Sequence, residues 1–277
     1  MDEQKLMMAV ADIARRAGHE IMQVYAHGAH IDVSIKSDDS PLTEADTRAN
    51  ELIMQALHAL TPDTPILSEE SAATAWQQRQ HWSSYWLVDP LDGTKEFISR
   101  NGEFTVNIAL VRKGEPVLGV VLVPVTGCCY FGFDGLGAWR QDQQEPALRI
   151  SSGSWPAADH DHTLRVVASR RHGGEALTRI LTQLQAHYPR IELVNMGSSL
   201  KICLLAEGKA DLYARLAPTS EWDTAAAHAI LRAAGGEIYQ PDFSPLRYNQ
   251  KESLLNPHFI AMAGQDPSHL QTILAAI

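Results

Sequence analysis

The sequence predicts a layered protein of α+β and α/β character, in which helices alternate with sheets. Two helical patterns open the chain, several strand patterns then follow one another, and strands alternate with helices in the rest. Successive strands favour antiparallel pairing, whereas strands separated by helices favour a mixed or parallel sheet. We therefore expect an antiparallel-rich half at residues 1–157 and a mixed half at residues 158–277. The boundary falls in residues 151–161, which are rich in turn-forming residues.

The elements of the first half follow from the spacing of apolar residues. Apolar side chains recur at three- and four-residue steps from Leu6 to Val24 and again from Ala45 to Leu60, which is the helical period. Alternating or continuously apolar runs bounded by turn residues indicate strands. The expected strands are Ile31–Ile35, Ile66–Ser68, Tyr85–Val88, Phe104–Val111, Val117–Val125 and Cys129–Phe133, the last ending at an Asp-Gly hairpin signal.

The second half alternates regularly between the two kinds of element. The expected strands are Leu164–Ala168, Glu192–Met196, Asp211–Ala214, Glu237–Gln240 and Phe259–Ala263. The expected helices are Glu175–His187, Ser199–Glu207, Asp223–Ala234 and Pro267–Ala276. This alternation indicates that helices cover the faces of a second sheet.

Composition excludes several classes of function. The formal net charge of −10 argues against a surface that coats a nucleic acid, although it permits a small anionic ligand in a local cleft. There is no apolar run of the length that a membrane-spanning helix needs, and the first residues do not resemble a secretory signal. Cys128, Cys129 and Cys203 are an odd set without metal-ligand spacing, which suits a reducing compartment. We expect a cytoplasmic protein.

The strongest local signal is the string Asp89-Pro90-Leu91-Asp92-Gly93-Thr94, which follows an apolar strand directly. Proline cannot continue a central strand and glycine permits a sharp turn, so we expect the chain to bend here. Asp89 and Asp92 would then reach a common point, where two carboxylates repel each other unless a cation neutralises them. Mg²⁺, which prefers oxygen ligands, is the natural partner. An ordinary Asp-Gly turn is the alternative.

Three further segments place acids at the ends of elements. Glu69 follows a short strand, and Asp223 stands where the N-cap of an alanine-rich helix belongs. Thr43 and Asp46 have the spacing of a capping box at the start of the second helix. Each of these acids has a purely structural interpretation on its own, as a solvated strand end or a helix cap.

Together these segments resemble the inositol monophosphatase family of lithium-sensitive, magnesium-dependent phosphatases. The string from Asp89 to Thr94 and the string Trp222-Asp223-Thr224-Ala225-Ala226 resemble the two diagnostic motifs of the family, in the expected order and separation. The resemblance extends from the first helix to Asn256-Pro257. It implies an αβαβα sandwich whose active site the second half completes.

Carried over position by position, the resemblance implies three groups of site residues. Metal would be held by the carboxylates of Glu69, Asp89, Asp92 and Asp223 and by the backbone carbonyl of Leu91. Asp46 and Thr94 would orient and deprotonate the attacking water. Substrate would contact Glu69, Leu91, Asp92, Gly93, Thr94, His172, Ser198, Lys201, Arg215 and Asp223. The string Ser169-Arg170-Arg171-His172 departs from the family pattern by an extra arginine.

Two segments resemble the branch of the family that acts on 3′(2′),5′-nucleoside bisphosphates, namely 101–107 and 197–201. The resemblance therefore implies Mg²⁺-dependent hydrolysis of the 3′-phosphate of 3′-phosphoadenosine 5′-phosphate, in sulfate assimilation, without a phosphoenzyme. About two to three Mg²⁺ ions are expected, with Li⁺ or Ca²⁺ inhibiting. The alternatives are an inositol monophosphatase or broad sugar-phosphate phosphatase with the same metal site, and a catalytically inactive metal- or nucleotide-binding regulator. A monomer is slightly favoured, and peripheral contact with the inner membrane is open.

Overall fold

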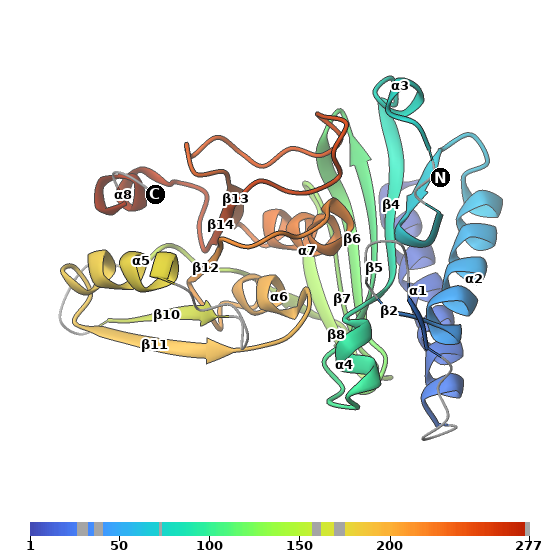
Figure 1. Ribbon diagram of the computed structural model, residues 1–277, viewed down its shortest axis with the longest axis horizontal. Coiled ribbons are helices and arrows are strands. Elements are labelled where there is room, and N and C mark those ends of the chain that lie inside the picture. The colour runs from blue at the N-terminus through green and yellow to red at the C-terminus, as the bar shows by residue number, and fades with distance from the viewer. Residues whose placement is uncertain (27–32, 36–40, 72–73, 157–161, 169–174, 275–277) are drawn as a thin grey trace.

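The computed structural model describes residues 1–26, 33–35, 41–71, 74–156, 162–168 and 175–274, and these form five stacked layers (Figure 1). The helices are α1 (Glu3–Ala26), α2 (Glu44–Leu60), α3 (Trp76–Arg79), α4 (Thr94–Ile98), α5 (Glu175–Gln185), α6 (Leu200–Ala206), α7 (Glu221–Ala233) and α8 (Ser268–Ile273), with a 3₁₀ turn η1 at Glu69–Ser71. Among the described residues, no helix is both long and apolar enough to cross a membrane.

The strands form two large sheets and one small ribbon. The ribbon pairs β1 (Val33–Ile35) with β2 (Pro41–Thr43). The seven-stranded sheet has the order β3 (Ile66–Ser68), β4 (Ser84–Asp92), β5 (Thr105–Arg112), β6 (Glu115–Val123), β7 (Cys128–Phe133), β8 (Gly137–Asp142) and β9 (Leu148–Ile150). The five-stranded sheet has the order β11 (Arg190–Asn195), β10 (Thr163–Ala168), β12 (Leu212–Arg215), β14 (Phe259–Met262) and β13 (Glu237–Tyr239).

The pairing directions agree with the two-part pattern in the sequence. The seven-stranded sheet is antiparallel throughout, except that β3 runs parallel to β4. In the five-stranded sheet, β10 runs parallel to β11 and to β12, whereas β14 runs antiparallel to β12 and to β13. Helices therefore connect the parallel strands, and short turns connect most of the antiparallel ones.

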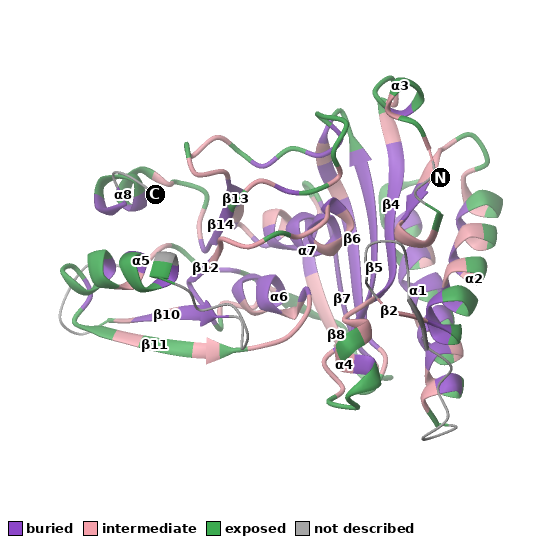
Figure 2. Ribbon diagram, in the orientation of Figure 1, coloured by how far each residue is buried: buried purple, intermediate pink, exposed green. Residues whose placement is uncertain are grey.

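Within the described part of the chain, three apolar cores hold the layers together. Helices α1 and α2 cover one face of the seven-stranded sheet, and α6 and α7 lie between its other face and the five-stranded sheet. Helices α5 and α8 cover the outer face of the five-stranded sheet. The order α, β, α, β, α is the sandwich that the resemblance implied. Figure 2 shows that the central strands and α7 are largely buried, whereas α1, α2 and α5 expose their outer faces.

Strand β5 shows why its sequence is apolar at almost every position. Val106, Ile108 and Leu110 face α1 and α2, whereas Ala109 and Val111 belong to the core around α7. Because a sheet covered on both faces buries both sets of alternating side chains, the strand contains no polar stripe of the usual kind.

Helix α7 approaches the seven-stranded sheet unusually closely at Gly119 of β6. A Cβ atom at this position would lie 2.0 Å from the carbonyl oxygen of Ala226. Glycine is therefore the residue that lets the backbone of α7 rest directly on the strand. Ala226 lies in the same helix as Asp223, so a shift of α7 at this contact would also move Asp223.

Most predicted elements are present, with bounds within a few residues of the expected ones. Two expectations were wrong. Strand β4 does not stop before Pro90 but continues to Asp92, because a bulge between Asp89 and Asp92 absorbs the proline. Helix α7 begins at Glu221 with Ser220 as its N-cap, so Asp223 is the third helical residue of a capping box rather than the cap. Ile31, residues 157–161 and Ala276 lie outside the described residues, and the division into halves at 157 stays a prediction.

Candidate active site

Three acids meet where β4 ends beside the first turn of α7. Asp89, Asp92 and Asp223 each offer a carboxylate oxygen, and these oxygens lie within 4.8 Å of one another. The bulge in β4 turns the side chains of Asp89 and Asp92 toward the same point. Asp223 reaches that point from α7 while its Oδ2 accepts a hydrogen bond from the backbone N–H of Ser220 at 2.9 Å.

Burial and mutual repulsion make this cluster unfavourable without a cation. Loss of water raises the pKa of Asp89 well above its ordinary value, and the charges of Glu69, Asp92 and Asp223 raise it further. Loss of water likewise raises the pKa of Asp223, with Asp92 as the next contributor. Carboxylates with raised pKa values and converging oxygens fit a hard divalent cation, which supplies the missing positive charge. The donor set therefore suits a metal ion with oxygen ligands.

Glu69 and Leu91 adjoin the same cluster. Parallel pairing of β3 with β4 sets Ser68 opposite Val88, so Glu69, the first residue after β3, lies beside Asp89 of β4. The influence of Glu69 on the pKa of Asp89 includes a side-chain hydrogen bond as well as its charge. The backbone N–H of Leu91 donates to Oδ1 of Asp89 at 3.0 Å. All five predicted metal-holding residues thus lie around the ends of β3 and β4 and the first turn of α7.

Asp92 is held by a layer of polar residues whose role the sequence did not reveal. Its Oδ2 accepts hydrogen bonds from the backbone N–H of Ser199 at 2.7 Å, Thr105 Oγ1 at 3.4 Å and Asn107 Nδ2 at 3.5 Å. The Ser199 hydroxyl in turn donates to Oδ1 of Asn107 at 2.9 Å. All three lie in the segments singled out for the bisphosphate branch. The β4–β5 register, with Asp92 opposite Thr105, brings Thr105 and Asn107 to Asp92, and the turn before α6 brings Ser199.

Asp46 and Thr94 form the pair that the resemblance implied. Thr94 Oγ1 donates to Oδ1 of Asp46 at 3.2 Å. Oδ2 of Asp46 is occupied separately, because it accepts from both the backbone N–H and the hydroxyl of Thr43 at 2.9 and 2.5 Å. The capping box therefore fixes the carboxylate while leaving one oxygen for Thr94. The structural and the catalytic interpretations of Asp46 are compatible.

A pocket of about 380 Å³ opens beside the acids and is lined by six of the predicted substrate residues, namely Asp92, Gly93, Ser198, Lys201, Arg215 and Asp223. Ser198 has a left-handed backbone with φ of 43°, and its carbonyl oxygen accepts from Lys201 Nζ at 2.6 Å. Burial lowers the pKa of the Lys201 ammonium, whereas Asp92 acts in the opposite direction. Arg215 donates to the carbonyl oxygens of Ala217 and Pro218 at 3.1 and 3.0 Å while it lines the pocket. His172 lies outside the described residues.

Further polar residues line this pocket that were not singled out from the sequence. Glu96 and Glu103 add negative charge opposite Lys201 and Arg215, and Lys95 stands at the turn after Gly93. The Glu103 side chain packs over Gly197, where a Cβ atom would lie 2.7 Å from Oε2 of Glu103. The pocket can therefore receive both the anionic and the hydroxyl groups of one ligand.

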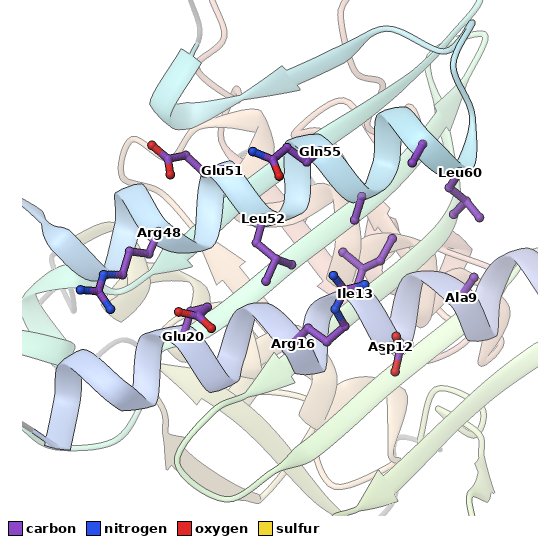
Figure 3. Close-up of a pocket in the computed structure, with 12 residues that line it drawn as sticks. Ala9, Asp12, Ile13, Arg16, Glu20, Arg48, Glu51, Leu52, Gln55 and Leu60 are labelled. Carbon is purple, nitrogen blue, oxygen red and sulfur yellow. The ribbon is translucent and has the colours of Figure 1, made fainter.

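A wider hollow of about 920 Å³ lies elsewhere, between the outer faces of α1 and α2 (Figure 3). Its lining mixes Asp12, Arg16, Glu20, Arg48 and Glu51 with small apolar side chains, and it includes none of the predicted site residues. Size alone would select this hollow. We place the candidate site at the smaller pocket, because buried charges of one sign converge there.

Comparisons with known proteins agree with this geometry. Residues 2–276 match the inositol monophosphatase family. The chain is 48% identical over 255 residues to the 3′(2′),5′-bisphosphate nucleotidase CysQ of Salmonella typhimurium, covering 92% of this chain and 98% of that protein. It is 37% identical to the Haemophilus influenzae protein of the same name, covering 95% and 94%.

A solved structure gives the same result. CysQ from Bacteroides thetaiotaomicron, described as a bacterial member of the inositol monophosphatase family, superposes with a TM-score of 0.80 at 44% identity. The match covers 95% of this chain and 99% of that one. Fold, acidic cluster and sequence similarity thus agree, and the chain belongs to the inositol monophosphatase family.

Proposed function

We propose that the protein hydrolyses the 3′-phosphate of 3′-phosphoadenosine 5′-phosphate to give AMP and phosphate, with Mg²⁺ as cofactor. The observation that carries the proposal is the convergence of Asp89, Asp92 and Asp223 beside the Asp46–Thr94 pair. Relatives that share up to 48% of their residues with this chain are named 3′(2′),5′-bisphosphate nucleotidases. The pocket next to the acids is lined by the positively charged side chains of Lys201 and Arg215, which could bind a second phosphate.

The metal would be held by Glu69, Asp89, Asp92, Asp223 and the carbonyl oxygen of Leu91. About two to three bound Mg²⁺ ions would neutralise charge on the phosphate and make the attacking water more acidic. The chain's own contribution is to hold these ligands in fixed positions. Ser199, Thr105 and Asn107 fix Asp92, and Ser220 fixes Asp223.

Asp46 would accept the proton of the attacking water by way of Thr94. The Thr94 hydroxyl already donates to Oδ1 of Asp46, so its oxygen can accept a proton from water as its own proton moves to the carboxylate. The water oxygen would then bond to phosphorus in line with the 3′-oxygen as the bond from phosphorus to the 3′-oxygen breaks. The departing 3′-oxygen would take a proton from solvent water, and no phosphoenzyme would form. The backbone and hydroxyl groups of Asp92, Gly93 and Thr94 would hold the phosphate that is cleaved.

Lys201, Arg215, Ser198 and His172 would hold the second phosphate and the nucleoside. Lys201 and Arg215 line one pocket with Ser198, so their charges act on the same ligand. A cation beside a phosphate forms charge-assisted hydrogen bonds, which distinguish a bisphosphate from a monophosphate. Inositol phosphates with a single phosphate would gain less from this pair.

The test is phosphate release from 3′-phosphoadenosine 5′-phosphate, inositol 1-phosphate and fructose 1,6-bisphosphate, each over a Mg²⁺ titration with and without Li⁺ or Ca²⁺. We expect the adenosine bisphosphate to have the highest kcat/KM, with no turnover in excess chelator and with inhibition by Li⁺ and Ca²⁺. A higher kcat/KM for inositol 1-phosphate would contradict the substrate, and turnover in chelator would contradict the metal.

We also propose a metabolic role, a cellular location and an oligomeric state for the protein. The activity would serve sulfate assimilation by removing the bisphosphate by-product. We place the enzyme in the cytoplasm as a monomer, with peripheral contact to the cytoplasmic face of the inner membrane as the alternative. Cell fractionation and light scattering of the purified chain test location and oligomeric state.

A further inference from the structure

A chain of buried hydrogen bonds runs from β13 to Thr224 in the first turn of α7, the residue that follows Asp223. Nε2 of His228 lies 2.5 Å from Oε1 of Glu237, and Nδ1 of His228 lies 3.0 Å from the Tyr248 hydroxyl. The Tyr248 hydroxyl donates to Oγ1 of Thr224 at 3.2 Å. His228, Tyr248 and Thr224 are each at most 2% exposed.

The number of hydroxyl protons available determines which group donates and which accepts in these bonds. Thr224 has one hydroxyl proton, which it donates to the carbonyl oxygen of Glu221 at 3.2 Å, so its oxygen accepts from Tyr248 and from Asn256 Nδ2. Tyr248 has likewise given its proton to Thr224, so its oxygen accepts from Nδ1 of His228. Glu237 only accepts. Both ring nitrogens of His228 are thus engaged, Nδ1 by the Tyr248 hydroxyl and Nε2 by the Glu237 carboxylate.

The end of this chain is next to a proposed metal ligand. Thr224 follows Asp223 directly and shares the first turn of α7 with it. Asn256 also holds the start of α7 in place, because its Nδ2 donates to the carbonyl oxygen of Ser220, the N-cap, at 2.8 Å. Tyr248 is itself fixed to the β5–β6 turn by its backbone N–H, which donates to Gly114 O at 3.0 Å. These hydrogen bonds thus connect the first turn of α7 to β13 and to the loop that follows β13.

We propose that His228 and Tyr248 are positioning residues for the metal site, which orient the first turn of α7 so that Asp223 faces Asp89 and Asp92. The inference rests on the proposed metal site. The four polar side chains of this chain lose their contact with water on folding, which opposes stability, whereas a fixed direction for Asp223 is needed for three carboxylates to share cations. Residues behind a metal ligand tune its affinity through orientation.

The test measures metal binding directly, in the absence of substrate. Tb³⁺, a hard cation with the same preference for oxygen ligands, is titrated into the full chain and its luminescence is excited through tryptophan. Tyr248→Phe removes the hydroxyl in the middle of the chain and should weaken Tb³⁺ binding by about tenfold, the lower end of the effect of residues that support a metal ligand. His228→Gln should act in the same direction.

Tyr239→Phe is the matched control, because Tyr239 is also a buried tyrosine whose hydroxyl makes one bond, to Gln265 O at 2.6 Å. Its melting temperature should fall, but its Tb³⁺ affinity should equal that of the wild type. Equal Tb³⁺ affinities for Tyr248→Phe and Tyr239→Phe would overturn the inference.

Asp223→Asn separates this inference from the one on which it rests. A strong loss of Tb³⁺ binding in Asp223→Asn together with an unchanged Tyr248→Phe would refute only the positioning role. No loss in Asp223→Asn would refute the metal site and the positioning role together. Should Tyr248→Phe fail to fold, Thr224→Val and Thr224→Ser replace it. The valine variant should lose affinity and the serine variant should retain it, and equal affinities would again refute the role.

Discussion

The hydroxyl of Thr94 donates to Oδ1 of Asp46 over 3.2 Å, although the two residues are 48 positions apart in the chain. Thr94 opens α4 directly after the bulged end of β4, and Asp46 lies in the first turn of α2. The second oxygen of Asp46 is fully used by Thr43. A carboxylate held in this way can accept a proton without moving, which suits a general base.

Asp46→Asn should lower kcat by about 10²–10⁴-fold, the usual contribution of a general base, because an amide cannot accept the proton that Thr94 passes on. Tb³⁺ affinity should change little, since Asp46 is not among the proposed ligands. The control is Glu44→Gln, an exposed change in the same helical turn at a residue paired with Arg48. Steady-state kinetics of the two variants give the comparison, and a near-normal kcat in Asp46→Asn would exclude the role.

Asp89→Asn should abolish nearly all turnover while leaving the fold intact, because a lost metal ligand costs several kcal/mol of transition-state stabilisation. In the presence of chelator, by contrast, this variant should be more stable than the wild type. Removing one buried charge relieves the repulsion from Glu69, Asp92 and Asp223, so the metal-free variant should melt at a higher temperature than the metal-free wild type. Retention of more than about a tenth of the rate at saturating Mg²⁺ would count against the ligand assignment.

Lys201→Ala should raise KM for 3′-phosphoadenosine 5′-phosphate by about tenfold or more, which corresponds to a hydrogen bond to a charged group. KM for a singly phosphorylated substrate should change much less. Lys209→Ala is the control, because Lys209 is 54% exposed and pairs with Glu207 away from the pocket. Equal effects of Lys201→Ala on the two substrates would remove the second-phosphate role.

Gly119→Ala should destabilise the protein by about 1–3 kcal/mol, the typical cost of overpacking, because the new Cβ atom would lie 2.0 Å from the carbonyl oxygen of Ala226. The strain displaces α7, so Tb³⁺ affinity should fall as well. Gly18→Ala is the comparison, since its Cβ atom would meet only the end of the Leu122 side chain, which can rotate. Chemical denaturation and Tb³⁺ titration of both variants test the coupling between this contact and Asp223.

The pKa of Glu237 lies below its ordinary value of 4.5. Burial raises this pKa, but the hydrogen bond and charge of His228, the backbone N–H of Ile238 and the charge of Arg232 together lower it more. A lowered folded-state pKa contributes stability above 4.5 that is lost as the pH falls below that value. The melting temperature of the wild type should therefore drop more steeply from pH 5 to pH 3 than that of Glu237→Gln. Parallel slopes would show that Glu237 has no such linkage.

Much of the fold was predictable because helices and strands here carry clear apolar periods. The alternation of strands and helices after residue 162 and the run of strands before it gave the two kinds of sheet correctly. The bulge at Pro90 was not predictable, because a proline within an apolar run usually ends a strand and only the partner strand β5 shows that pairing resumes at Asp92. The cap of α7 was misplaced for a similar reason, since Ser220 and Asp223 are both good N-cap residues.

The candidate site was predictable as a set of residues but not as an arrangement. The strings around Asp89 and Asp223 indicated metal ligands, and the structure brings their oxygens together. The supports of Asp92 depend on strand register and on a backbone N–H from a distant turn, neither of which a sequence pattern specifies. His228 resembled an ordinary helical residue, because its partners Glu237 and Tyr248 come from later segments.

The position of α7 between the two sheets has a consequence for biosynthesis. A nascent chain that has emerged only through β9 has the carboxylates of β4 but lacks the one that α7 contributes. With the proposed metal site incomplete, such a chain would bind divalent ions weakly and would lack the phosphatase activity until α7 is made. Binding of a divalent ion at the proposed site would then favour the state in which both sheets are packed against α7.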